Sequence, residues 1–330
     1  MATLFITEQN AVLRKTSERL IVEKDHKVLL EVPSLKLETV LIYGNVQVTT
    51  QALCELLDHG IELALLSRSG RLRGQLTPPK AKNMRLRMRQ YELSQDEAFC
   101  LELSRTVVAT KIASSAAVLW RFRKNHPDAL AESEIADVER AAEGLETVAS
   151  LDSLRGVEGT AAARYFHCLG RMAPAAVRFE GRNRRPPRDP LNALLSFGYV
   201  LVGSEIQSLL DAMGFDPYLG FYHQIDYGRP SLALDLLEEF RAPLVDRLSL
   251  RLLNLGILAV DDFTKTPEGG VVLEREALKR YFAAYQEQLT QEIALPEGSR
   301  SFRDLFRRQA ERLARALTEG EPYMPFRLPD

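Results

Sequence analysis

Short runs rich in β-branched and other apolar residues, separated by turn residues, fill the first 76 positions of the chain. Such runs are typical of strands. One helix interrupts them at 49–60, with Thr49 or Thr50 as its cap and Gly60 at its end. The strands expected from the pattern are TLFIT, RLIVE, KVLLEVP, LKLETVLIYG, VQVT, IELALLS and LRGQL. This part of the chain therefore predicts a small β-rich domain.

From about residue 93 the apolar positions follow helical spacing to the end of the chain. A capping box of Ser94 and Glu97 predicts the start of a helix that runs to near Asn125. A second helix is expected to open on Asp189 with Pro190 at its first position. Further helices are expected over SLALDLLEEFRAPLVDRLSLRLLNLG and over about 274–293 and 302–318. The second part of the chain is therefore predicted to be mostly α.

The fold class expected from these patterns is α+β, with an N-terminal β-rich domain followed by a larger all-α C-terminal domain. A chain of 330 residues, 45% of them hydrophobic, is long enough for two such domains. The expected boundaries are 1–78 for the β-rich domain, 79–92 for a basic linker that contains LTPPKAKN, and 93–330 for the helical domain.

Cysteine usage and apolar runs exclude several classes of protein. The three cysteines are widely spaced and form no CxxC pair, which argues against a disulfide framework or a zinc site. The first residues, MATLFITEQNAV, lack the pattern of a signal peptide, and no uninterrupted apolar run approaches the roughly 18 residues that a membrane span needs. A soluble cytoplasmic protein without a membrane partner is expected.

The net charge of −2 hides strongly segregated local charge. Residues 68–89 carry a charge of +8 and residues 171–188 a charge of +5, whereas residues 128–150 carry −6. Basic patches of this kind suit a phosphate-binding surface, although solvated faces and an exposed linker explain the composition equally well. The candidate DNA-binding residues are Arg68, Arg71, Arg73, Arg85, Arg87, Arg164, Arg182, Arg184, Arg185 and Arg188.

The stretch GFYHQIDYGRPSLALDLLEEFR raises a sharper question, because it places a histidine just before a helix that carries several acids. Asp235 and Glu238 are three residues apart, so helical spacing puts them on one face. Most such sets are solvated, and the histidine is then an ordinary loop residue. Alternatively, His223 folds back over the helix and joins the acids around a metal ion.

Upstream, Glu158 lies between Gly156 and Gly159 in an alanine-rich segment expected at the start of a helix. A glutamate in a first helical turn usually serves the helix dipole, but this setting also suits an inward-pointing carboxylate. Two carboxylates and one imidazole from separate segments would make an open site for Mg²⁺ or Mn²⁺, since hard cations prefer oxygen ligands.

Three ordered blocks carry a resemblance to a known family: GVEGTAAARYF, DPLNALLSFGYVLVGSEIQSLLDAMGFDPYLGFYH and GRPSLALDLLEEFRAPLVDR. Together they resemble the CRISPR-associated spacer-acquisition integrase, also described as an endonuclease, which is the metal-dependent subunit of the CRISPR adaptation complex. The blocks cover at least 156–247, and the β-then-α division extends the likeness over essentially the whole chain.

The resemblance implies a metal site made by a glutamate, a histidine and a second acid. Carried over by motif, these catalytic and metal-binding residues are Glu158, His223 and Glu238, with Asp235 as a supporting acid or alternative ligand. Tyr165, Asn192 and Arg241 also fall inside the matching blocks. Each of these three is expected either to contact DNA or support the ligands, or simply to pack.

The function implied is metal-dependent insertion of short foreign DNA into a CRISPR array by phosphodiester transesterification, and with water in place of a hydroxyl the same site would act as a nuclease. The partners implied are double-stranded and branched DNA, a second copy of the chain bound through the β-rich domain, and a small ferredoxin-like adaptation protein. Two rivals stay open: a structure-specific repair nuclease that acts alone, and an inactive DNA-binding scaffold.

Overall fold

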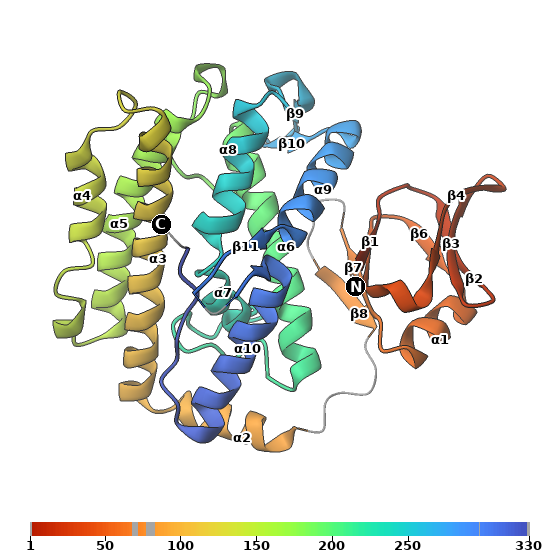
Figure 1. The fold of residues 1–330 in the computed structure, drawn as a ribbon, viewed down its shortest axis with the longest axis horizontal. Coiled ribbons are helices and arrows are strands. Elements are labelled where there is room, and N and C mark those ends of the chain that lie inside the picture. The colour runs from red at the N-terminus through yellow and green to blue at the C-terminus, as the bar shows by residue number, and fades with distance from the viewer. Residues whose placement is uncertain (1, 68–71, 77–82, 297, 329–330) are drawn as a thin grey trace. The chain divides into compact units, whose positions relative to one another are not determined.

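The computed structural model describes residues 2–67, 72–76, 83–296 and 298–328 (Figure 1). The chain divides into two compact units, Met1–Asn83 with Gln207–Phe215, and Met84–Ile206 with Asp216–Asp330. The first is rich in strands and the second is mostly helical, as the sequence pattern predicts. The segment expected as a linker at 79–92 includes most of a helix, α2 (Met84–Leu93).

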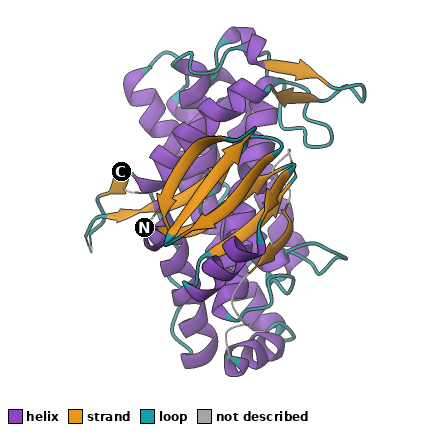
Figure 2. Ribbon diagram, turned by 90° about the vertical axis from the view of Figure 1, so that its right-hand side faces the viewer, coloured by secondary structure: helices purple, strands orange, loops and turns teal. Residues whose placement is uncertain are grey.

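The first unit contains two four-stranded sheets, whose strands are orange in Figure 2. One sheet has the order β1-β5-β7-β8, in which β1, β5 and β7 are parallel and β8 is antiparallel. The other has the order β4-β3-β2-β6, in which only β2 and β6 pair in parallel. The strands are β1 (Ala2–Ile6), β2 (Ala11–Thr16), β3 (Arg19–Lys24), β4 (Lys27–Pro33), β5 (Leu37–Tyr43), β6 (Val46–Val48), β7 (Glu62–Leu66) and β8 (Leu72–Leu76).

Both sheets contribute to one hydrophobic core together with helix α1 (Thr50–Asp58). Thr49 caps this helix, as one of the two predicted candidates, because its side chain accepts a hydrogen bond from the backbone of Ala52 at 3.3 Å. Strand β2 is absent from the sequence prediction. Its alternate residues Ala11 and Leu13 are fully buried, but it is only half apolar and contains two cations.

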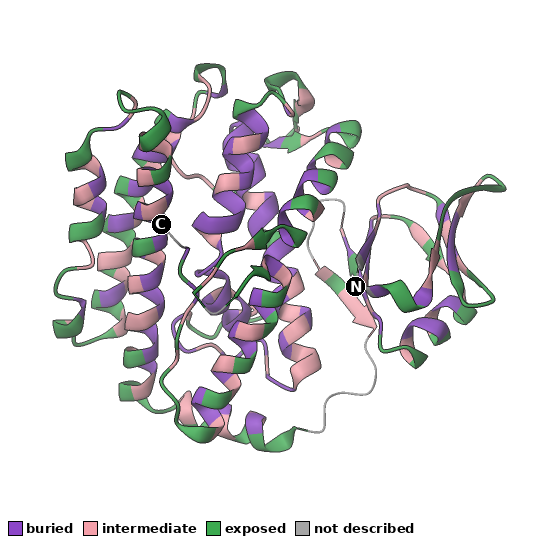
Figure 3. Cartoon of the chain, in the orientation of Figure 1, coloured by how far each residue is buried: buried purple, intermediate pink, exposed green. Residues whose placement is uncertain are grey.

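The second unit is a set of helices, and Figure 3 shows buried residues on the sides of these helices that face one another within it. Two very short two-stranded sheets accompany them. The long helices are α3 (Glu97–Asn125), α5 (Leu151–Met172), α6 (Pro190–Met213), α9 (Arg275–Thr290) and α10 (Phe302–Glu319), and the shorter ones include α4 (Glu132–Arg140). The part of α6 from Gln207 onward belongs to the first unit. Helices α9 and α10 lie where the sequence predicts helices.

Helix α3 ends at Asn125 as predicted, but the predicted capping box at its start is wrong. Asp96 caps the helix instead, because its carboxylate accepts from the backbone nitrogens of Ala98 and Phe99, both at 3.0 Å. The Ser94 hydroxyl is used elsewhere and donates to the carbonyl of Tyr91.

Helix α6 begins at Pro190 behind Asp189, whose carboxylate accepts from the backbone of Asn192 at 2.8 Å, so the predicted cap is correct. Among the described helices, α6 alone is long and apolar enough to cross a membrane, with a mean hydropathy of 1.4 over its best window. However, 67% of that window is buried inside the protein. This burial is typical of a core helix.

The single long helix expected from Ser231 onward is broken into three pieces. Helix α7 (Ser231–Leu237) ends early, a π-helical segment η4 (Arg241–Asp246) follows, and α8 (Arg247–Asn254) resumes regular spacing. Pro243 lies inside η4 and has no N–H to donate to the carbonyl one turn earlier, which explains why the regular helix does not continue. The break leaves Glu238 at the end of α7.

Helix α5 begins at Leu151, capped by Ser150, and not close to Glu158 as the sequence suggested. Glu158 therefore lies in the interior of the helix and cannot serve as a first-turn acid for its dipole. The position excludes a role for Glu158 in stabilising the helix dipole. It therefore favours the second explanation, an inward-pointing carboxylate.

Candidate functional site

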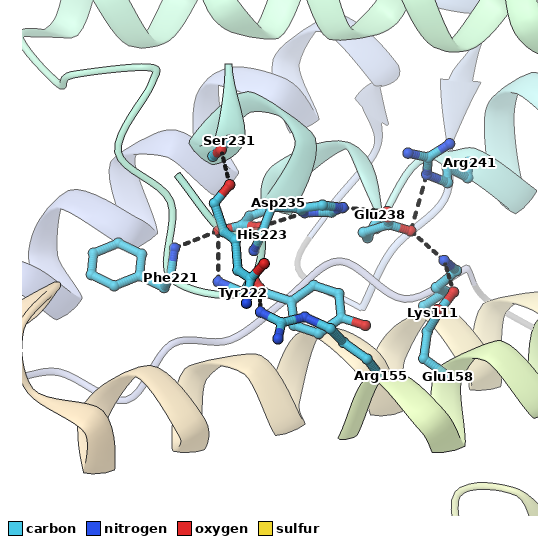
Figure 4. Close-up of polar contacts among 11 residues, drawn as sticks. Lys111, Arg155, Glu158, Phe221, Tyr222, His223, Ser231, Asp235, Glu238 and Arg241 are labelled. Carbon is cyan, nitrogen blue, oxygen red and sulfur yellow. Dashed lines mark hydrogen bonds and ion pairs between the residues drawn. The ribbon is translucent and has the colours of Figure 1, made fainter. Parts of the chain in front are cut away.

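Residues from three helices and one loop meet inside the second unit (Figure 4). Helix α3 contributes Lys111, α5 contributes Glu158, the loop before α7 contributes His223, and the end of α7 contributes Glu238. The ammonium of Lys111 contacts a carboxylate oxygen of Glu158 and lies 2.6 Å from Oε2 of Glu238. The structure therefore brings both predicted acids to one cation.

Glu238 is almost fully buried, with 3% of its side chain exposed, yet it is held as a carboxylate. Burial alone would raise its pKa, but the Arg241 guanidinium, the Lys111 ammonium and His223 lower the pKa to about 2. Arg241 Nε lies 3.0 Å from the same Oε2 atom that Lys111 approaches. Both cations therefore form ion pairs with the same carboxylate oxygen.

Asp235 holds the histidine and its loop in place. Its carboxylate accepts hydrogen bonds from the backbone nitrogens of Phe221, Tyr222 and His223 at 2.6–3.0 Å. It also lies 2.7 Å from the Nδ1 atom of the His223 ring. The other ring nitrogen, Nε2, is 3.7 Å from Glu238 Oε1. The imidazole is thus fixed through one nitrogen while the other is directed at the second acid.

Gly220 allows the loop to approach α7 this closely. A Cβ atom at position 220 would lie 2.7 Å from Oδ2 of Asp235 and 2.8 Å from the backbone carbon of Ser231. Both separations are shorter than a carbon atom tolerates, so a side chain here would displace the loop or the acid. Asp235, which the first sequence pattern left as a member of a solvated face, is 6% exposed.

Glu239 belongs to a different set of contacts, although it adjoins Glu238 in sequence and is 0% exposed. It accepts hydrogen bonds from Gln309 Nε2 at 2.8 Å and from the backbone nitrogen of Phe326 at 2.6 Å, and it contacts the Tyr323 hydroxyl. Burial raises the pKa of Glu239 to about 7, against the opposing effect of these hydrogen bonds. Glu239 therefore anchors the C-terminal segment and is no part of the cluster around Lys111.

A buried polar network lies beside the acids. The hydroxyls of Tyr165 and Tyr199 both donate to the carboxylate of Asp246, at 2.8 and 2.5 Å. Burial raises the pKa of Asp246 to about 6. The Arg241 guanidinium lies over the Tyr199 ring at 4.4 Å from its centre. Tyr165 therefore supports the packing around Arg241, which in turn holds Glu238.

Asn192 is fully buried and fixes the arginine-rich loop that precedes α6. Its amide donates to the carbonyl of Gly181 at 2.8 Å and to Asp189 at 2.6 Å, and its oxygen accepts from Arg182 at 2.8 Å and from the backbone of Asn183 at 3.0 Å. With all of its hydrogen-bonding atoms used inside the protein, Asn192 positions this loop.

A cavity of about 40 Å³ opens next to Glu158. Cationic side chains from three elements line it, together with Glu158, Asp246 and the two tyrosines bonded to Asp246. These cations are Lys111, Arg182, Arg184 and Arg241. Arg182 and Arg184, two of the predicted DNA-binding residues, therefore lie next to a predicted metal ligand.

Known proteins resemble this chain over most of its length. The model of the family CRISPR associated protein Cas1 matches residues 4–287. CRISPR-associated endonuclease Cas1 2 of Rhodospirillum rubrum is 37% identical over 305 residues, which cover 89% of this chain and 88% of that protein. CRISPR-associated endonuclease Cas1 3 of Thermus thermophilus is 35% identical over 331 residues, covering 99% and 97%.

This chain belongs to the Cas1 family. The resemblance seen in the three sequence blocks is thereby confirmed. Solved structures agree on the Cas1 fold: a Cas1 protein from Thermotoga maritima has a TM-score of 0.82 at 23% identity, with 99% of both chains covered. A casposase bound to integration product has a TM-score of 0.86 at 22% identity, covering 98% of this chain and 93% of the casposase.

A third similar structure is a Cas6-RT-Cas1–Cas2 complex, with a TM-score of 0.81 and 26% identity. The match covers 97% of this chain but 35% of the chain in that complex. The Cas1 fold thus occurs both as a chain of this length and as one part of a larger polypeptide.

Glu158, Glu238 and His223 supply two carboxylates and one imidazole nitrogen, which are donor groups that suit a hard divalent ion. Glu158 and Glu238 already share one cation, the Lys111 ammonium, which shows that both acids can reach a common positive charge. As the side chains stand, no three His, Cys, Asp or Glu residues in the described parts of the chain lie close enough to hold a metal ion.

The other predicted basic residues of this Cas1 chain are spread over its surface. Arg68 and Arg71 lie outside the described residues. Arg164 is exposed and donates to the carbonyl of Asp137. The remaining predicted DNA-binding arginines do not line the cavity and are exposed or half-buried. They are Arg73 on β8, Arg85 and Arg87 on α2, and Arg185 and Arg188 in the loop before α6.

Lys111, which contacts both acids, was not among the residues expected from the sequence. A signal for it exists, because Lys111 is the sole charged residue in the helical stretch 106–120. If the fold buries such a charge, an acidic partner must compensate it. Tyr199 and Asp246 were also missed, since nothing in their local sequence marks them as members of one network.

Proposed function

We propose that this protein is a divalent-metal-dependent DNA endonuclease and integrase, which inserts short DNA fragments into a CRISPR array by phosphodiester transesterification. Its membership of the Cas1 family and the names of its endonuclease relatives support this function. The observation that carries it is the convergence of Glu158 and Glu238 on one cation, with His223 held against the second acid.

Glu158, Glu238 and His223 would hold the ion, which we propose to be Mg²⁺ or Mn²⁺. When bound, such an ion polarises a phosphoryl oxygen and stabilises charge on the attacking and leaving oxygens. Asp235 would keep His223 oriented, with Nδ1 engaged and Nε2 available as the ligand atom. Arg241 would keep Glu238 ionised at all physiological pH values.

In the proposed integration step, the 3′-hydroxyl oxygen of the incoming DNA forms a bond to a phosphorus atom of the array, and the bond from that phosphorus to its 3′-oxygen breaks. One phosphodiester replaces another, so no nucleotide cofactor is consumed. The attacking hydroxyl loses one proton and the released 3′-oxygen gains one, so protons are neither consumed nor produced overall. With water as the attacking group, the same arrangement gives cleavage.

The DNA backbone would run past the arginine-rich loop before α6. Arg182 is partly buried, and its acceptors are two amide oxygens and the Ser196 hydroxyl, with no carboxylate among the described residues. Burial lowers its pKa, which indicates a charge that the protein itself does not fully compensate. Arg184 is exposed beside it at the cavity. Guanidinium groups in this state suit phosphate oxygens.

Arg188 offers a matched control for this DNA contact, because it is an exposed arginine of the same loop that does not line the cavity. Arg184→Ala should weaken DNA binding and lower the salt dependence of the binding constant by about one unit of slope. The affinity of Arg188→Ala should change less. Equal effects of the two changes would show that the loop contributes only general positive charge.

We propose that two copies of the chain associate through the strand-rich unit. Strand β4 is an edge strand that exposes three consecutive apolar residues, Val28, Leu29 and Leu30, at 53%, 50% and 44%. An apolar edge of this kind favours pairing with another chain. Leu30→Glu should lower the molecular mass measured by light scattering to that of one chain. The second partner we propose is a small ferredoxin-like protein, and support for a protein partner comes from the similar structure of a Cas6-RT-Cas1–Cas2 complex.

The function is tested by comparing wild type with Glu158→Gln in cleavage and strand-transfer assays on branched DNA, with Mn²⁺ or with EDTA. Wild type should act only with the metal, and the variant should lose activity while keeping DNA affinity. Glu146→Gln, the same change at an exposed glutamate, serves as the control. Absence of activity in both wild type and Glu158→Gln would leave only a DNA-binding scaffold, and equal measurable activity would show that Glu158 is not a ligand. Integration that needs the partner, beside cleavage that does not, would favour adaptation over solitary repair.

A further inference from the structure

One side chain of the site carries the opposite charge to the ligands around it. The Lys111 ammonium contacts Glu158 and is 2.6 Å from Glu238, and 18% of the Lys111 side chain is exposed. Figure 4 shows the ammonium between the two acids. A lysine between two residues that suit a divalent ion is not needed to bind that ion.

The position of Lys111 is set by the fold. It lies on α3, which packs against both α5 and η4, the elements on either side of the site. No other charged residue occurs between positions 106 and 120, so this one cation is directed inward from an otherwise uncharged stretch. Burying a lone ammonium is costly unless acids compensate it, which ties Lys111 to Glu158 and Glu238.

The charges near the site explain what the ammonium does there. Without Lys111, Glu158 and Glu238 would face each other, and among the ion pairs of the described residues Arg241 reaches Glu238 but not Glu158. Two acids held close together repel each other and separate unless a positive charge lies between them. A lysine is suited to this position, because its ammonium is a compact point charge on a flexible stem.

We infer that Lys111 is a built-in cation that holds the two acids together in the metal-free protein and must be displaced when a divalent ion binds. The inference rests on the proposed metal dependence and adds a competitor to it. The cavity next to Glu158 is also lined by Lys111, so the ammonium has space to leave the acids without leaving the site. Lys111 therefore keeps the ligands arranged and, for the same reason, weakens the affinity for metal.

The test measures metal binding and stability without DNA or turnover. Lys111→Met, which keeps the length of the stem and removes the charge, should bind Mn²⁺ more tightly than wild type by about tenfold in a titration of free Mn²⁺ followed by electron paramagnetic resonance. In EDTA the same variant should melt several degrees lower than wild type, and added Mn²⁺ should restore more of its melting temperature than it adds to wild type. Lys124→Met, an exposed lysine near the end of the same helix, should change neither quantity.

Lys111→Arg separates the charge from the packing of the side chain. It should retain most of the melting temperature in EDTA, because the positive charge between the acids remains. A melting temperature as low as that of Lys111→Met would overturn the inference, since packing alone would then explain the loss. If Lys111→Met does not fold in EDTA, its recovery on addition of Mn²⁺ supports the inference, and failure to fold in both conditions overturns it.

The failure of this inference can be told apart from the failure of the proposed function. Equal or weaker Mn²⁺ binding by Lys111→Met, beside clear binding by wild type, rejects the competition and leaves the metal-dependent function intact. Absence of Mn²⁺ binding in both proteins rejects both ideas, because an ammonium then has no metal ion to compete with.

Discussion

Glu238 and Glu239 are neighbours in the chain, and both are buried, yet the two regions they enter have opposite chemistry. Glu238 is surrounded by cationic groups, and its pKa falls to about 2. Glu239 meets a tyrosine, a glutamine and a backbone amide, and burial raises its pKa to about 7. Both groups lose contact with water to a similar extent, so the charge of the partners decides which form is stable.

The difference separates a site from a structural anchor. The region around Glu238 concentrates charge that only other charges compensate, and such an arrangement is retained where an ion or a charged substrate must be bound. The region around Glu239 uses neutral dipoles to fix the C-terminal segment against the turn that follows α7. Neutralising each acid in turn is the direct way to test this contrast.

The largest effect is expected from Glu238→Gln. It leaves Lys111 and Arg241 without the acid between them, which should destabilise the metal-free protein by about 3–5 kcal/mol. Strand transfer in Mn²⁺ should fall by at least about 100-fold, because a ligand is lost. Urea unfolding in EDTA and single-turnover assays measure the two effects. A stable, active variant would show that the cationic surroundings of Glu238 serve no ion.

Glu239→Gln should leave activity intact and change how stability depends on pH. The folded-state pKa of about 7 lies above the ordinary value of 4.5, so the folded protein keeps this proton after the unfolded chain has lost it. Stability from this group is complete below about pH 4.5 and is lost as the pH rises to about 7, by up to about 3 kcal/mol.

The matched measurement is urea unfolding of wild type and Glu239→Gln between pH 4.5 and 8. Wild type should lose stability relative to the variant up to about pH 7, and the two curves should run in parallel above that pH. The same trend in both proteins would assign the titration to another group. Asp246 is the first alternative, since burial raises its pKa to about 6.

Asp235→Asn should have a smaller effect, confined to the Glu238 region. The amide oxygen can replace only one of the two carboxylate oxygens, so the amide nitrogen would face either the backbone nitrogens of Phe221 and Tyr222 or the backbone and ring nitrogens of His223. We expect a loss of about 10–100-fold in metal affinity or strand transfer, as is usual when the partner of a ligating histidine is changed. A variant with normal Mn²⁺ affinity but altered rate would show that His223 transfers a proton and does not bind metal.

Tyr323→Phe is expected to have the smallest effect. It removes one hydroxyl contact to Glu239 and should cost about 1 kcal/mol of stability, without any change in Mn²⁺ binding. Thermal unfolding at pH 6 and the metal titration check this. Loss of metal affinity in this variant would show that the two regions are not independent.

Much of the fold could be predicted from local patterns, because alternation, caps and turn residues act over a few positions. Asp189 and Pro190 set the start of α6 as expected. Errors arose where two candidates compete within a few residues, as when Asp96 caps α3 in place of Ser94. The interruption by Pro243 was visible in the sequence, but the strong apolar pattern on either side favoured one continuous helix.

The candidate site was predictable only as far as motifs reach. Glu158, His223 and Glu238 were expected from matching blocks, and the structure places the two acids on one cation and His223 against Glu238. Lys111 lies 47 residues before Glu158, outside every block, and becomes visible only when α3 packs against α5. Periodicity also could not show that Asp235 is buried, because the loop that covers it comes from outside its helix.

Gly220 has a consequence for how variants of this chain should be read. A single methyl group at this position meets Asp235 and the backbone of Ser231, so Gly220→Ala would disable the histidine loop from a residue that binds nothing. A genetic survey that scores a gene as competent because its acids and its imidazole are intact would count such an allele as functional. A survey of this kind should therefore score Gly220 together with the acids and the imidazole.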